Sequence, residues 1–331
     1  MALKDVIGQE GAIKILKSAV LNRRAASAYL FQGPSGIGKR LAAVNFAKAL
    51  NCQKSPDDGD ACDSCPVCRR IEEGIYPDVR EVRPEKGAIK IDEIRDLEEK
   101  LSLSAYEGKF KVAIVVEAHL MNKQASNAFL KCLEEPPSDS VIILVSSNPD
   151  RLLDTIKSRC QAVVFKPLSA RDMSLLLKDR IKEPDMLQTL ISLSMGRPGL
   201  VLEGKAGGSG ILKKRQDFLK SLQDMLISKP GKSPSWADKE EIEEFMDGLE
   251  IFLRDMLVMR TTGREDLAML GPDIPEGLKT FFKTAKEEVI IDCYQGVATL
   301  RESLVYNPNK SILWNYTAGM LKKLLPPSKK A

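Results

Sequence analysis

The 331-residue sequence contains a single histidine, His119, and this scarcity excludes most histidine-based chemistry. A catalytic triad or a metal centre built on imidazole groups has almost no material in such a chain. We expect His119 to lie at a helix start or an interface rather than to act as a catalytic group. Other side chains must therefore carry the function.

Long apolar runs are lacking as well. No stretch approaches the roughly 18 apolar residues that a membrane-spanning helix needs, so no contact with a membrane is expected. The first six residues, M-A-L-K-D-V, lack the charged and then apolar layout of a secretion signal. We therefore expect a cytoplasmic protein.

An excess of charge of one sign is also missing, because 50 lysine and arginine residues face 46 acidic residues and the formal net charge is +4. This balance is too mild for a dedicated DNA-binding domain, although it leaves room for a basic face. With 43% hydrophobic and 29% charged residues the composition is that of a globular protein, long enough for two or three domains.

The first half of the chain alternates short apolar runs with helical patterns. Helices are predicted over 40–50 and 122–135, where apolar or small residues recur at intervals of three and four. Strands are predicted at the apolar runs 29–31, 112–116, 141–145 and 161–165. Strands that alternate with helices indicate an α/β fold, with a parallel sheet covered by helices on both faces.

Beyond Pro167 every pattern is helical. Residues 169–202 are predicted to form a small group of helices, and 204–210 a glycine-rich hinge. Between Ile242 and Met259, apolar residues are spaced 3, 4, 3, 4 and 3 residues apart. Such a stripe is typical of a packed helical bundle, and a seam between subunits of an oligomer is the alternative.

A glycine-rich segment at residues 33–40, G-P-S-G-I-G-K-R, fits a phosphate-binding loop at all positions but the last. Glycines would let the backbone aim N–H groups at phosphate oxygens, and Lys39 would reach the β and γ phosphates. The loop ends in Ser or Thr in nucleotide-hydrolysing proteins, and that hydroxyl holds Mg²⁺. Because Arg40 cannot replace it, the chain's own ATPase chemistry is in doubt.

A second segment, K-V-A-I-V-V-E-A-H at residues 111–119, has the shape of a strand that ends in D-E-A-H. Val116 stands where the aspartate that anchors Mg²⁺ belongs. Glu117 keeps the position of the group that would polarise the attacking water. Two independent losses around one metal indicate a site that does not hydrolyse nucleotide.

Three cysteines form a C-x2-C-x2-C run, Cys62, Cys65 and Cys68, and Cys52 lies ten residues before it. Thiolates bind Zn²⁺ tetrahedrally, and tight C-x2-C turns place successive sulfurs around one ion. Four thiolates make a closed, structural site. We expect zinc, and four reduced thiols or an iron–sulfur cluster are the alternatives.

The S-R-C segment at 158–160 follows S-S-N-P at 146–149. Arginine presents a rigid, permanently charged fork that suits phosphate, and an arginine supplied to another subunit's nucleotide stabilises the charge of phosphoryl transfer. Taken alone, the segment indicates only a surface arginine. Its place after the predicted strand and the Ser-Ser pair favours a role at phosphate.

Together these segments resemble the clamp-loader branch of the AAA+ ATPases over nearly the whole chain. The resemblance begins at D-V-I-G-Q-E, residues 5–10, and includes the phosphate loop, the four cysteines and Y-P-D-V at 76–79. The run N-A-F-L-K-C-L-E-E-P-P at 127–137 is highly specific to clamp-loader subunits. The four-cysteine module is a feature of the bacterial members.

This sequence departs from the catalytic members of that family at Arg40, Val116 and Gly199, the last being where they carry a nucleotide-sensing arginine. The resemblance therefore implies a stationary subunit that does not hydrolyse ATP, while Arg159 matches the arginine presented to a neighbour's ATP. The implied site residues are Arg159 as catalytic arginine in trans, Gly33, Gly36, Gly38, Lys39, Arg40, Glu117 and Ser147 in a degenerate nucleotide site, and Cys52, Cys62, Cys65 and Cys68 as zinc ligands.

The resemblance also implies an architecture. Residues 1–166 would form the AAA+ domain with the zinc module at about 50–80, 167–208 a small helical lid, and 209–331 a helical collar. The chain would join ATPase subunits and a delta subunit in a hetero-pentamer of the DNA polymerase III holoenzyme. It would reach the sliding clamp and primer–template DNA through that complex.

Two other functions remain as alternatives. Lys39 and Glu117 favour an active ATPase motor subunit, and the four-cysteine module could serve a zinc-dependent DNA-binding protein. Binding of ATP or ADP without turnover also stays open, because Lys39 and the glycines can hold phosphate without Mg²⁺.

Overall fold

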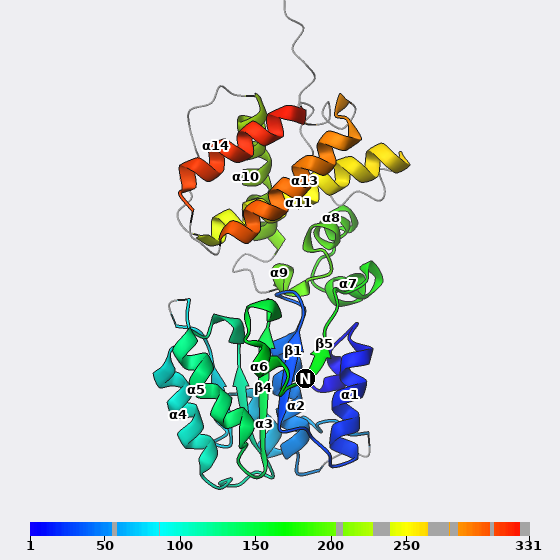
Figure 1. Cartoon of the computed structure of the whole chain (residues 1–331). Coiled ribbons are helices and arrows are strands. Elements are labelled where there is room, and N and C mark those ends of the chain that lie inside the picture. Colours follow the sequence, from blue (N-terminus) through cyan, green and yellow to red (C-terminus); the bar gives the residue numbers. More distant parts are fainter. Residues whose placement is uncertain are drawn as a thin grey trace, which may run out of the picture. The chain divides into compact units, whose positions relative to one another are not determined.

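A computed structural model describes residues 1–54, 58–85, 87–202, 208–227, 239–263, 278, 284–304 and 308–324 (Figure 1). The chain forms two compact units. The first comprises Met1–Lys182 with Gly196–Leu200, and the second Glu183–Met195 with Val201–Ala331. The division into three domains at 166 and 208 stays a prediction.

The first unit is built on a five-stranded sheet in the order β2-β3-β4-β1-β5, and every strand pair is parallel. The strands are β1 (Ala28–Gln32), β2 (Val79–Val82), β3 (Lys111–Val115), β4 (Ser140–Ser146) and β5 (Gln161–Val164). The parallel sheet and the four strands predicted from apolar runs are confirmed. Sequence reasoning missed β2, because its sequence, V-R-E-V, has two charged residues at its centre and therefore no apolar run.

Helices cover both faces of the sheet, as the pattern predicted. Tyr29 and Phe31 of β1 pack into one core cluster, and Leu30 between them packs into another, because successive side chains of a strand point to opposite faces. The helices of the first cluster are α1 (Glu10–Leu21), α2 (Lys39–Asn51) and α3 (Pro66–Glu72). Those of the second are α4 (Ile91–Ser102), α5 (Lys123–Glu134) and α6 (Asp154–Lys157).

Beyond the sheet, the described residues form helices. They are α7 (Ala170–Leu177), α8 (Pro184–Ser194), α9 (Pro198–Leu202), α10 (Gly208–Ile227), α11 (Lys239–Thr262), α13 (Glu287–Ser303) and α14 (Lys310–Leu321). The predicted hinge falls partly outside the described residues, at 204–207, and 208–210 open α10. None of the helices in the described ranges has the length and apolar character that crossing a bilayer requires.

The apolar stripe of α11 is buried within the second unit. Five of its side chains lie in one core cluster with residues of α10, α13 and α14, and Met259 is half-buried against it. The five are Ile242, Phe245, Leu249, Phe252 and Met256. The stripe therefore packs within this helical unit, since its side chains are covered by the chain itself.

Candidate functional site

The glycine-rich loop lies between β1 and α2, the context that a phosphate-binding loop requires. Gly33, Gly36 and Gly38 all have positive φ, and Gly38 precedes the first turn of α2. At Gly33, with φ of 148°, a Cβ atom would meet the carbonyl oxygen of Phe165 at 2.3 Å. The loop conformation therefore depends on glycine at this position.

Lys39 folds back onto the loop that carries it. Its ammonium group donates hydrogen bonds to the carbonyl oxygens of Gly33 at 2.6 Å and Pro34 at 2.7 Å. Burial lowers the pKa of Lys39 to about 8, and the negative charge of Glu117 opposes this shift. A phosphate group would have to compete with two backbone carbonyls for this cation.

Glu117 and Ser147 meet at the carboxyl ends of β3 and β4. The Ser147 hydroxyl donates a hydrogen bond to Oε2 of Glu117 at 2.7 Å. His119 Nδ1 lies 3.4 Å from the same oxygen and 3.2 Å from Oγ of Ser146. The structure thus brings together two of the predicted site residues, Glu117 and Ser147, and places His119 in contact with Glu117.

Arg40 points its guanidinium at a carboxylate rather than at a metal position. Its Nε lies 2.7 Å from Oε1 of Glu81, and a second nitrogen donates to Oε2 at 2.9 Å. Burial alone would raise the pKa of Glu81, yet hydrogen bonds from Arg40 and Arg83 lower it. Sequence reasoning missed Glu81 because it lies in β2, the strand that the apolar pattern did not indicate.

At positions 116 and 199, valine and glycine stand where the catalytic members of the family carry an aspartate and an arginine, so two polar side chains are absent beside the loop. Val116 follows β3 and donates its backbone N–H to the carbonyl oxygen of Val82 at 2.9 Å, while its side chain packs on the apolar core. The N–H of Gly199 donates to the carbonyl oxygen of Gly36 at 2.7 Å. A Cβ atom on Gly199 would meet Cα of Gly36 at 2.7 Å, so backbone directly contacts the loop here.

Arg159 follows α6 and has two hydrogen-bond partners. One terminal nitrogen donates to the backbone oxygen of Thr155 at 3.0 Å, and the other to Oε1 of Glu134 at 2.8 Å. The arginine side chain is 37% exposed. Because a guanidinium has five N–H groups, three remain beyond these two contacts for a further acceptor.

The four cysteines of the predicted metal site come together. Their Sγ atoms all lie within 4.8 Å of one another, and those of Cys62 and Cys68 are 4.0 Å apart. The backbone N–H groups of Cys62, Cys65 and Cys68 each donate to the sulfur of the preceding cysteine at 3.4 Å. Such bonds stabilise thiolates, the form in which cysteine binds a metal.

Hydrogen bonds and burial shift the pKa values of two of these thiols in opposite directions. Burial opposes the shift, but hydrogen bonds from Ser64 and from the Cys65 N–H lower the pKa of Cys62 to about 6. Burial and the neighbouring thiols raise the pKa of Cys68. Four thiolates at this spacing would repel one another, and a bound dication would remove that repulsion. The donor set therefore fits a metal ion.

The comparisons with known proteins agree with these motifs. The model of the family described as "DNA polymerase III, delta subunit" matches residues 8–169. DNA polymerase III subunit delta' of Bacillus subtilis strain 168 is 29% identical over 330 residues, which cover 95% of this chain and 96% of the relative. The chain belongs to the delta' family of DNA polymerase III clamp-loader subunits.

Other relatives are further subunits of DNA polymerase III. Subunit delta' of Pseudomonas aeruginosa strain PAO1 is 37% identical over 218 residues, or 64% of this chain and 66% of the relative. Subunit tau of Bacillus subtilis strain 168 is 40% identical over 168 residues, or 51% of this chain and 30% of the relative. The family recognised from the motifs is thereby confirmed.

Two buried carboxylates of this delta' family member organise the surroundings of the cysteine cluster, and sequence reasoning missed both roles. Asp60 accepts the backbone N–H groups of Leu3 at 2.8 Å and Lys4 at 2.9 Å. Asp78 of the Y-P-D-V segment accepts three successive N–H groups, at 2.7, 2.9 and 2.7 Å, from residues 106–108. Asp78 thus anchors the loop at residues 106–108.

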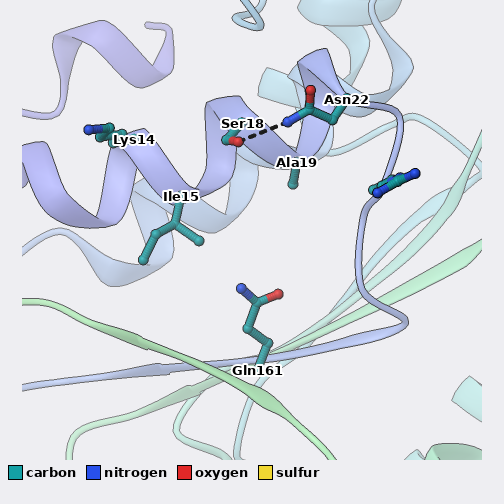
Figure 2. A pocket seen from close by; sticks show the side chains of 7 residues that line it. Lys14, Ile15, Ser18, Ala19, Asn22 and Gln161 are labelled. Atoms are coloured by element: carbon teal, nitrogen blue, oxygen red, sulfur yellow. Dashed lines mark hydrogen bonds between the residues drawn. The ribbon is translucent and has the colours of Figure 1, made fainter.

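A hollow of about 790 Å³ lies elsewhere in this unit, between α1 and the start of β5. Figure 2 shows Gln161 extending from the strand and Asn22 hydrogen-bonded to Ser18 on the helix. The residues that line this hollow are Lys14, Ile15, Ser18, Ala19, Asn22, Arg24 and Gln161. The hollow shares no lining residue with the phosphate loop, and we assign no function to it.

Proposed function

We propose that this chain is the stationary, non-hydrolysing subunit of a DNA polymerase III clamp loader. In this role it supports opening of the sliding clamp and completes a neighbouring subunit's ATP site with Arg159. Its partners would be the ATPase subunits and the delta subunit in a hetero-pentamer, acting on primed DNA in the cytoplasm. The observation that carries the proposal is the contrast between a phosphate loop without metal-holding groups and an exposed arginine with N–H groups to spare.

The chain's own nucleotide site lacks two side-chain oxygens that would hold Mg²⁺, a hydroxyl at position 40 and a carboxylate at position 116. Arg40 occupies the hydroxyl position and is already paired with Glu81, while the Val116 side chain offers no donor atom. Lys39 is bonded to carbonyls of its own loop. Without the metal, the charge that develops on the transferred phosphoryl group would lack its divalent counterion, so hydrolysis is not expected.

Arg159 has the properties that the proposed role demands. It is permanently charged, its side chain is 37% exposed, and three of its five N–H groups are left for phosphate oxygens. An arginine supplied in trans contributes about 10³- to 10⁵-fold to the rate of phosphoryl transfer in the systems where it has been measured. Ser158 and Cys160 would serve only to place it.

For the cysteine cluster we propose a structural Zn²⁺ held by Cys52, Cys62, Cys65 and Cys68. A tetrahedral ion about 2.3 Å from each sulfur sets the sulfurs about 3.8 Å apart. The Cys62 and Cys68 sulfurs are 4.0 Å apart and all four sulfurs lie within 4.8 Å of one another, which supports one ion over a larger iron–sulfur cluster. Bound to four thiolates, the ion would stabilise the fold and take no part in catalysis.

An active ATPase motor subunit is the second candidate. The hydrogen bond between Ser147 and Glu117, together with Lys39 in the loop, keeps part of a hydrolytic site in place. This function requires Mg²⁺ to bind without the two groups that the sequence lacks. It also predicts that activity of the loader depends on Lys39.

The test is ATP hydrolysis by the loader reconstituted with this chain and the other subunits of its organism. Hydrolysis is measured with clamp and primed DNA for wild type, Arg159→Ala and Lys39→Ala. We expect at least about a tenfold loss with Arg159→Ala and little change with Lys39→Ala. A loss with Lys39→Ala and none with Arg159→Ala would favour the motor subunit instead.

A further inference from the structure

Arg159 is held by an acidic partner from another helix. Glu134 is the last residue of α5, and its Oε1 accepts a hydrogen bond from Arg159 at 2.8 Å. The second contact of the guanidinium is the backbone oxygen of Thr155 in α6, at 3.0 Å. Two acceptors on different helices therefore define the direction of the side chain.

We propose that Glu134 is a positioning residue for Arg159. It fixes the guanidinium in one orientation before a neighbouring subunit's ATP arrives, with the remaining N–H groups left for phosphate oxygens. The inference rests on the function proposed above, because a positioned arginine matters only if Arg159 acts on a nucleotide in trans.

The argument for positioning is one of conformational entropy. An arginine side chain has several rotatable bonds, and ordering them opposes contact with a distant phosphate. An arginine bonded at two nitrogens has lost part of that freedom in the free chain. Contact with the transition state then costs less, which is the general advantage of a preorganised catalytic group.

A purely structural role for the pair is disfavoured by its surroundings. The Arg159 side chain is 37% exposed and that of Glu134 is 52% exposed, and ion pairs this open to water contribute little to folding. Removing the carboxylate should therefore leave the fold intact. The consequence of losing Glu134 should appear in the rate of ATP hydrolysis rather than in stability.

The opposite role would be a latch, in which Glu134 competes with phosphate for Arg159. The two roles predict opposite signs for one substitution. A latch that is removed would release Arg159 and raise ATP hydrolysis, whereas a positioning residue that is removed would lower it. The spare N–H groups favour positioning, because the guanidinium can hold a carboxylate and a phosphate at the same time.

The experiment compares Glu134→Ala and Glu134→Gln in the reconstituted loader, with clamp and primed DNA. Glu135→Ala is the matched control, because it removes the same charge from the adjacent exposed residue at the end of α5. We expect Glu134→Ala to lower kcat about three- to tenfold with a smaller change in KM. Glu134→Gln, which keeps the acceptor oxygen, should recover much of that loss, and Glu135→Ala should match wild type.

The double variant Glu134→Ala with Arg159→Ala separates positioning from other effects. It should be no slower than Arg159→Ala alone, because Glu134 acts through Arg159. A rate for Glu134→Ala that equals or exceeds wild type, or a further loss in the double variant, would overturn the inference. If Arg159→Ala itself changes nothing, the proposed function fails; if only Glu134→Ala is silent, the positioning role alone fails.

Discussion

At the scale of single residues, Lys39 is the most costly side chain of the candidate nucleotide site. Its residue is only 4% exposed, and burial lowers its pKa to about 8 while two carbonyls hold the ammonium. A buried cation with neutral acceptors costs stability that a hydrophobic side chain would not. Such a cost is typical of a site built for an anion, which supports the phosphate loop proposed above.

Replacement of this lysine by methionine should stabilise the protein near neutral pH. Because the pKa of Lys39 is lower in the folded state than the ordinary 10.5, the unfolded chain binds more protons between about pH 8 and 10.5. Wild-type stability therefore rises with pH through that window, and Lys39→Met should flatten the rise. The gain at pH 7 is at most about 3 kcal/mol, reduced by the two carbonyls that lose their donor.

Urea unfolding at pH 7.5 and pH 10 measures this effect. We expect Lys39→Met to exceed wild type in stability at the lower pH and to approach it at the higher pH. An equal difference at both values would show that protonation of Lys39 is not the cause. Lys48→Met is a suitable contrast, because Asp63 and Glu72 raise the pKa of Lys48 despite its burial, so its removal should destabilise.

At the scale of elements, α3 and the end of α2 depend on the cysteine cluster. Cys52 ends α2, Cys65 caps α3 and Cys68 lies within it, so one ion would fasten both elements to the loop that carries Cys62. The sulfurs come from a short stretch of chain with little apolar side chain of its own. A structural metal is the usual means of stabilising such a segment.

Loss of one ligand should release the ion and loosen this segment. We expect about one Zn²⁺ per chain in the wild type by elemental analysis, and a strong reduction in Cys62→Ser with a lower melting temperature. Cys132→Ala is the control, since this buried cysteine lies outside the cluster and its loss should keep the metal. Iron in place of zinc, or wild-type metal content in Cys62→Ser, would contradict the assignment.

Element by element, sequence reasoning succeeded where local spacing carries the information. The four-cysteine cluster follows from a C-x2-C-x2-C run, and β4 follows from apolar residues because it is buried on both faces. The edge strand β2 was missed, since the two charged residues at the centre of V-R-E-V interrupt any apolar run. Glu81, which lies in β2, was missed for the same reason. Its ion pair with Arg40 shows which contact Arg40, the residue that departs from the phosphate-loop pattern, makes in this fold.

At the scale of the whole molecule, the family could be predicted from its motifs, whereas contacts between distant residues could not. The role of Arg159 was predicted from the S-R-C segment, its place after a predicted strand and the family resemblance, but its partner Glu134 lies 25 positions away in the sequence. Only the packing of α5 and α6 in one unit joins them. The same holds for Asp60, whose hydrogen bonds reach residues more than 50 positions earlier in the chain.

The proposed division of labour is also a property of the whole molecule. In the proposed role, a subunit without its own metal site can keep one conformation while its neighbours change with bound nucleotide. Its exposed arginine would then contact the ATP of one neighbour only. The phosphate loop, sheet and helices would serve as a frame that holds Arg159 in place. In this account, a mutation of Arg159 slows ATP hydrolysis in a neighbouring chain and not in this one.

Single-turnover hydrolysis tests that central claim most directly. The reconstituted loader is filled with ATP and mixed with clamp and primed DNA, and phosphate release is followed for wild type, Arg159→Lys and Arg159→Ala. The account predicts a first turnover at least about tenfold slower at the neighbouring ATP site that Arg159 completes, with ATP binding unchanged, for both variants. Arg159→Lys should be slow as well, because lysine keeps the charge but not the planar fork of the guanidinium. First-turnover rates equal to wild type in Arg159→Ala would contradict it.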